Sequence, residues 1–148
     1  FFNKIFMVTN DLTVGIVCSR FNEQIIKQIS KACTSKLKVL GVRDEAIIYE
    51  NVPGALEIPI ALQNIINKDK PDVLIAIGAV VRGDTYHFEV VSEQSASGIM
   101  RVQLDNSIPI INAVLTTNTA EQALQRVIVK GEEAAEAAIE MAIKFAAN

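Results

Sequence analysis

The chain has 148 residues, half of them hydrophobic, a net charge of −3 and a pI of about 5.2. This length predicts a single domain over residues 1–148, with a core that needs no disulfides. The acidic balance argues against a nucleic-acid partner, which needs a basic surface, and no apolar run approaches the ~18 residues of a membrane span. Two cysteines are too few for a disulfide-stapled secreted fold, and FFNKIFMV lacks the features of a secretion signal. We therefore expect a cytoplasmic protein.

Four short apolar runs predict β-strands, and each is rich in residues that favour strands. They are TVGIVC (13–18), AIIYE (46–50), VLIAIGAVV (73–81) and IPIINAVL (108–115). The third run has no polar alternation, as expected for a central strand buried on both faces. We expect one further strand, KIFMVT (4–9), to pair with a sheet edge or with a neighbouring subunit, since no crossover helix follows it.

Helical patterns with a 3.6-residue period separate and follow the strands. They cover residues 25–40, 58–66, 89–104 and 120–129, and an alanine-rich helix over 131–147 ends the chain. Strands that alternate with helices predict an α/β fold, with a parallel sheet covered by helices on both faces. Ligands of such sheets bind at the carboxyl ends of the strands.

The segment RGDTYHF follows the third predicted strand and contains His87, the only histidine of the chain. Asp84 or Thr85 could cap the next helix, and the free N–H groups at its start could bind an anion. At this edge His87 could transfer protons. The alternative is a capping loop with a structural histidine.

Two other loops open at the same edge of the predicted sheet. In NVPGALEIP, Glu57 could accept hydrogen bonds from substrate hydroxyls, or it could simply favour the start of a helix. In SRFNEQ, Phe21 could stack on a planar ring, or it could pack against its own helix as a hydrophobic staple.

The segment TNTAEQALQR predicts a capped helix, because Thr119 and Gln122 have the spacing of a capping box. The apolar stripe of this helix is formed by Ala120, Ala123, Leu124, Val127 and Ile128. Arg126 lies off the stripe, so it is either solvated or reaches a neighbouring subunit. Asn112, inside an apolar strand, needs a hydrogen-bond partner if it is buried.

The two cysteines lie far apart in the sequence. Cys33 falls on a helical apolar stripe and is expected to be core, whereas Cys18 ends a strand and could be reactive. One histidine and two distant cysteines give no metal-ligand spacing.

Taken together, five motifs resemble the lumazine synthase family of riboflavin biosynthesis. They occur in the family's order and cover residues 13 to about 143: GIVCSRFN, VPGALEIPIAL, GAVVRGDTYHFEVVSEQSASGIM, LTTNTAEQALQR and KGEEAAEAAIEMA. The resemblance implies a four-stranded parallel sheet between two helix layers, similar to flavodoxin, and a homopentamer or a multiple of it. It also implies that 5-amino-6-(D-ribitylamino)uracil condenses with 3,4-dihydroxy-2-butanone 4-phosphate, without metal or organic cofactor.

The resemblance also implies roles for individual residues. Phe21 stacks on the pyrimidine, whose ring also contacts the backbone of Ala79, Val80 and Val81. Ala55, Leu56 and Glu57 hold the ribityl chain, and His87 transfers protons. Asp84 and Thr85 lie at the phosphate end, and Arg126 binds the phosphate from the adjacent subunit.

The sequence departs from the family pattern at two places. Many members carry Phe at the position of Asn112, and Asn cannot stack on a heterocycle, so only its backbone contacts are transferred. The link VIVKGEEAA after Arg126 is shorter than in many members, and Lys130 within it is a candidate phosphate contact. Because this link is associated with larger shells, assembly beyond the pentamer stays open.

Two other functions fit the same fold. One is an archaeal-type riboflavin synthase, which uses the lumazine as its substrate. The other is a non-catalytic flavin-binding or shell-forming protein, because a fold alone does not determine a function.

Overall fold

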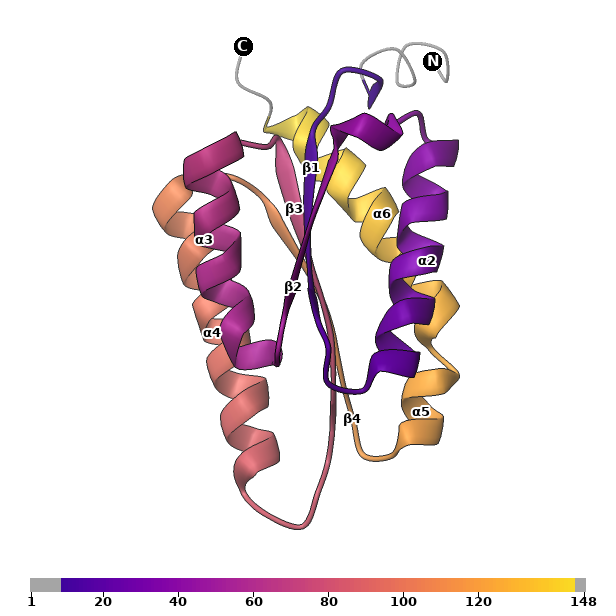
Figure 1. Cartoon of the computed structure of the whole chain (residues 1–148), viewed down its shortest axis with the longest axis vertical. Helices are drawn as coiled ribbons and strands as arrows, with labels where there is room; N and C mark the ends of the chain where they lie inside the picture. The colour runs from indigo at the N-terminus through magenta and orange to yellow at the C-terminus, as the bar shows by residue number, and fades with distance from the viewer. Residues whose placement is uncertain (1–8, 146–148) are drawn as a thin grey trace.

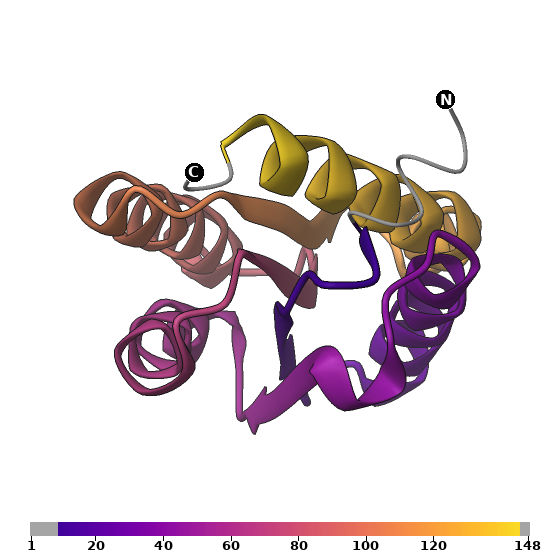
Figure 2. The ribbon, with the colours of Figure 1, turned by 90° about the horizontal axis from the view of Figure 1, so that it is seen from above.

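The computed structural model describes residues 9–145, which form a four-stranded parallel sheet between two layers of helices (Figures 1 and 2). The strands are β1 (Val14–Ser19), β2 (Ile47–Val52), β3 (Val73–Val81) and β4 (Ile110–Thr117), in the order β2-β1-β3-β4. The helices are α2 (Glu23–Val39), α3 (Ile58–Asp69), α4 (His87–Asn106), α5 (Ala120–Leu124) and α6 (Val127–Lys144), with short 3₁₀ turns η1 (Asp44–Ala46) and η2 (Ala55–Glu57). The predicted three-layer α/β/α fold is therefore confirmed.

Each face of the sheet has its own hydrophobic core. On one face α2 and α6 pack together, and on the other face α3 packs against α4 (Figure 2). Strand β3 lies between β1 and β4 and is covered on both sides, so Val73 to Ala79 are all buried. This arrangement explains the absence of polar alternation in its sequence and confirms the prediction of a central strand.

Helices α2 and α6 approach each other closely because α6 presents small residues. A Cβ added at Gly131 would lie 2.5 Å from the backbone oxygen of Ile29, which leaves no room for a side chain there. Ala134, Ala135 and Ala138 are buried along the same helix. The alanine-rich sequence of α6 therefore allows it to pack closely against α2.

The prediction of one helix over 120–129 is wrong, because the chain breaks between α5 and α6. The N–H of Arg126 donates to the carbonyl oxygen of Ala123 at 2.9 Å, only three residues back, and a new helix begins at Val127. Ala123 and Val127 are buried, but the rest of the predicted stripe is exposed: Ala120, Leu124 and Ile128. The predicted stripe was wrong because a 3.6-residue period holds only along one helix axis, and here the axis changes between α5 and α6.

The bounds of β3 are as predicted, and most other boundaries differ by one or two residues, but α3 ends three residues later than predicted, at Asp69, and α6 begins four residues earlier, at Val127. Strand β4 begins after Pro109, which has no N–H to donate, and the N–H of Ile110 donates to Oε1 of Gln103 at 2.7 Å. The additional strand predicted over 4–9 lies outside the described residues apart from Thr9, and so do residues 146 and 147 of the last predicted helix. Within residues 9–145, no helix combines the length and apolar character needed to cross a membrane.

Candidate active site

Three loops meet at the carboxyl edge of the sheet and are joined by hydrogen bonds. The loop after β1 binds the loop after β2, since the N–H of Phe21 donates to the carbonyl oxygen of Pro53 at 3.1 Å. The same loop also binds the end of β3, because the side-chain amide of Asn22 donates to the carbonyl oxygen of Ala79 at 2.9 Å. These bonds hold the loops in fixed positions around one space.

That space is a cavity of about 460 Å³, within the range typical of small-molecule sites. Nine of the predicted site residues line it: Phe21, Ala55, Leu56, Glu57, Ala79, Val80, Val81, Thr85 and His87. They come from the loops after β1, β2 and β3 and from the end of β3 itself, which are far apart in the sequence. The parallel sheet brings them together because its strands all end at the same edge.

Phe21 lies at the mouth of the cavity with 74% of its surface exposed. This exposure argues against the alternative in which the ring is buried as a hydrophobic staple on α2. A planar apolar side chain held beside a cavity can stack on a heterocycle.

Glu57 combines a structural contact with a position on the cavity wall. Its Oε1 accepts a hydrogen bond from the N–H of Gly54 at 2.9 Å, and the N–H of Glu57 donates back to the carbonyl oxygen of Gly54 at 3.1 Å. This reciprocal pair stabilises the turn after β2. Both sequence alternatives are therefore compatible with its position.

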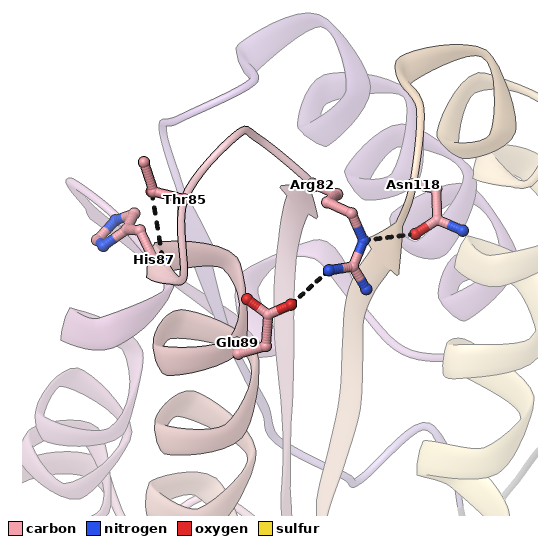
Figure 3. A network of polar contacts seen from close by, with 5 residues as sticks. All are labelled: Arg82, Thr85, His87, Glu89 and Asn118. Atoms are coloured by element: carbon pink, nitrogen blue, oxygen red, sulfur yellow. Dashed lines mark hydrogen bonds and ion pairs between the residues drawn. The ribbon is translucent and has the colours of Figure 1, made fainter.

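His87 is the first residue of α4, two residues earlier than the predicted helix start, and its exposed side chain reaches the cavity. Its N–H donates to Oγ1 of Thr85 at 3.4 Å (Figure 3). Thr85 thus gives weak support to the helix start, although Tyr86 occupies the N-cap position. Asp84 is exposed and is not among the residues that line the cavity.

Arg126 and Lys130 lie together at a second hollow, beside Glu133 and the end of β4. The guanidinium of Arg126 donates to the carbonyl oxygen of Gln122 at 2.7 Å and is exposed. This agrees with the prediction that Arg126 does not face its own core. Within one chain, Arg126 and Lys130 are not brought to the cavity.

Asn112 also lies outside the cavity, on the edge strand β4. It is exposed, and its Oδ1 accepts a hydrogen bond from the N–H of Val114 at 2.9 Å. The side chain therefore satisfies a backbone donor of its own strand.

Neither cysteine has the environment of a nucleophile. Both are buried. Burial raises the pKa of the Cys18 thiol, and it raises the pKa of the Cys33 thiol to about 12. Reactive thiols need a lowered pKa, so the option of a reactive Cys18 is not supported. Residues 9–145 contain no cluster of His, Cys, Asp or Glu that could hold a metal ion.

Several residues of this region were not predicted from the sequence. The cavity is also lined by Gly83 and by Phe88 and Val91 of α4. Arg82 directly follows β3 and forms a network with Glu89 and Asn118 (Figure 3). Val91 is buried in the core beneath the cavity, and Phe88 lies in the first turn of α4, which begins before the predicted start at 89.

The fold and the cavity define an α/β protein with a small-molecule site at the carboxyl edge of a parallel sheet. Residues 11–145 match the family model described as 6,7-dimethyl-8-ribityllumazine synthase. Similar proteins with this name include one from Nitrosospira multiformis, 55% identical over 132 residues, which cover 89% of this chain and 82% of the relative. Another, from Burkholderia mallei, is 53% identical over 131 residues, which cover 88% of this chain and 76% of the relative. The chain belongs to the 6,7-dimethyl-8-ribityllumazine synthase family.

Proposed function

We propose that this chain is a transferase that makes 6,7-dimethyl-8-ribityllumazine, the penultimate step of riboflavin biosynthesis. It condenses 5-amino-6-(D-ribitylamino)uracil with 3,4-dihydroxy-2-butanone 4-phosphate and releases one phosphate and two water molecules. The observation that carries the proposal is the single cavity lined by nine residues that match the family's motifs. The relatives named above favour this function over a riboflavin synthase or a non-catalytic flavin-binding protein.

The cavity offers complementary surfaces for the pyrimidine substrate. The exposed ring of Phe21 is available for stacking, and the half-buried end of β3 at Val80 and Val81 supplies backbone groups for the edge of the heterocycle. Ala55, Leu56 and Glu57 form the wall for the ribityl chain, whose hydroxyls can donate to the Glu57 carboxylate. Asp84 and Thr85 would lie towards the phosphate end.

The site of a neighbouring subunit would be completed by Arg126, Lys130 and Asn112. In one chain they lie apart from the cavity, so a shared site requires an interface that brings the second hollow of one chain to the cavity of the next. A repeated head-to-tail contact of this kind forms a ring when its rotation closes, and a homopentamer or a multiple of it fits the family resemblance.

The main contribution of the protein to the reaction would be to orient the two substrates. Holding an amine and a ketone side by side can supply a large effective molarity, on the order of 10⁵ M or more at best. Phosphate loss then needs a cation on the developing anion and a group that moves protons, roles that we assign to Arg126 and His87. We also propose that residues 1–148 form one domain and that the enzyme is cytoplasmic.

The test is incubation of the purified protein with both substrates. We expect lumazine absorbance to appear together with an equal amount of free phosphate, and neither when one substrate is omitted. Riboflavin formed from the lumazine alone would favour the riboflavin synthase alternative. Binding of a flavin without turnover in either assay would favour the non-catalytic alternative.

A further inference from the structure

We propose that Arg82 is a positioning residue for His87, because its guanidinium attaches the first turn of α4 to the loop after β4. The inference depends on the proposed function, which assigns proton transfer to His87. It adds a residue that lies outside the cavity lining and that no substrate contact would reveal.

The segment between β3 and α4 has little packing of its own. Residues 82–87 are all exposed, and a Cβ added at Gly83 would meet nothing within 4 Å. The N-cap residue Tyr86 makes no side-chain cap hydrogen bond, and the 3.4 Å contact from the N–H of His87 to Thr85 is too long to be strong. Another group must therefore determine where α4 begins.

Arg82 supplies three contacts with one planar side chain. Its Nε donates to Oδ1 of Asn118 at 2.8 Å, its Nη1 forms an ion pair with Glu89, and its Cζ lies 4.3 Å from the ring centre of Phe88 (Figure 3). The hydrogen bond from Arg82 also lowers the pKa of Glu89, so this carboxylate stays charged. A guanidinium can serve three partners in fixed directions, whereas a lysine ammonium is a single point.

Asn118, the partner of Arg82 in the loop after β4, is itself held in place. The backbone N–H of Arg82 donates to the carbonyl oxygen of Thr117 at 2.9 Å, and the N–H of Asn118 donates at 2.8 Å to Oε1 of Gln122, the N3 residue in the capping box of α5. Arg82 thus joins the start of α4 to a capped helix start that follows β4. Arg82 and Asn118 are 36 positions apart in the sequence.

The effect on His87 passes through the helix and not through contact. Glu89 and Phe88 directly follow His87 in the first turn of α4, so fixing them fixes the backbone of His87. In Figure 3 the imidazole points away from Arg82 and towards Thr85. Exposed ion pairs add little to stability, so we expect Arg82 to position His87 and not to stabilise the fold.

The first experiment compares Arg82→Lys with Arg101→Lys in the full-length assembled protein. Arg101 is a matched control, since it forms an exposed ion pair with Asp105 at the far end of the same helix. We expect Arg82→Lys to lower kcat by roughly 10-fold, well within the loss that a 1 Å misplacement can cause, with a KM for the pyrimidine substrate within about twofold of wild type. The control should keep both values, and both variants should keep the wild-type Tm.

A double-mutant cycle tests whether Arg82 acts through His87. If it does, Arg82→Lys should cost no further activity in a His87→Ala background. Additive losses, or an unchanged kcat in Arg82→Lys alone, would overturn the proposal. Should Arg82→Lys fail to assemble, Glu89→Gln and Asn118→Ala each remove one anchor and must reproduce the same kcat loss.

A second measurement does not need activity. His87 is the only histidine, so its imidazole Cε1–H signal in NMR is identified without assignment. We expect this signal to shift or broaden in Arg82→Lys and to stay in place in Arg101→Lys, and identical spectra would overturn the inference. A wild-type protein that makes no lumazine would refute the proposed function, and the NMR comparison would still decide whether Arg82 positions His87.

Discussion

The side-chain amide of Asn22 donates a hydrogen bond to the carbonyl oxygen of Ala79 over 2.9 Å, so the loop after β1 is attached to the end of β3. Asn22 has a φ of 66°, in the left-handed region that asparagine tolerates better than most residues. It is also the residue that precedes α2. One side chain thus holds Phe21 beside the strand that forms a wall of the cavity.

Substitutions at Asn22 separate its hydrogen bond from its backbone conformation. Asn22→Gly keeps the left-handed conformation and loses the bond, at a cost of about 1 kcal/mol. Asn22→Ala loses the bond and adds backbone strain of roughly 1–2 kcal/mol. We expect the KM for the pyrimidine substrate to rise in both variants and the Tm to fall further in Asn22→Ala. Equal Tm values, or an unchanged KM, would show that the loop is held by other contacts.

Glu57→Gln removes a charge while keeping an oxygen that can accept from the N–H of Gly54. Loss of a charged hydrogen bond to a ribityl hydroxyl, worth about 1.5 kcal/mol, should raise the KM for the pyrimidine substrate roughly tenfold. The KM for the phosphate substrate should change less. Steady-state kinetics with each substrate varied in turn measures the difference. Equal weakening of both substrates would indicate damage to the loop, as expected for Glu57→Ala, which also loses the turn contact.

The buried thiol of Cys33 predicts a dependence of stability on alkaline pH. Its pKa is raised from an ordinary value of 9.0 to about 12 by burial. The folded state therefore holds this proton more tightly, and the stabilisation that it provides is complete below pH 9 and is lost as the pH rises towards 12. The Tm advantage of wild type over Cys33→Ala should shrink across that window. A difference that stays constant would mean that Cys33 titrates normally in the folded protein.

The order of strands and helices, and the loop that carries His87, could be predicted because β3 is a continuous apolar run and the carboxyl edge of a parallel sheet is defined by topology. The surroundings of Arg126 could not be predicted, because hydrophobic periodicity does not reveal where one helix ends and the next begins along a new axis. The left-handed Asn22 and the three contacts of Arg82 also escaped prediction. Both depend on partners that only the folded sheet brings close, such as Asn118, which is 36 residues from Arg82.

His87→Ala should lower kcat by roughly 10-fold or more, the range expected for a general acid–base group, with a smaller effect on the KM of either substrate. Spontaneous condensation of the two substrates limits the loss. The measurement is kcat between about pH 6 and 8, where an imidazole changes charge. A variant with the wild-type kcat throughout this range would remove His87 from the proton-transfer step.

We propose that the reaction takes place where the cavity of one chain meets the Arg126 surface of another. Arg126→Ala should raise the KM for the phosphate substrate, at a cost of roughly 1.5–3 kcal/mol for a lost charged hydrogen bond. His87→Ala and Arg126→Ala are each impaired alone. In a mixed ring, however, some interfaces combine the intact His87 of one chain with the intact Arg126 of the next.

The most direct test dissociates the two variants, mixes them in equal amounts and reassembles them. Random assembly of a head-to-tail ring gives an intact site at about a quarter of the interfaces, so about a quarter of the wild-type activity should return. Each variant taken through the same procedure alone should gain nothing. The mass of the products verifies that mixed oligomers have formed. If these show no recovery of activity, His87 and Arg126 act in the site of a single chain, and the proposed shared site is contradicted.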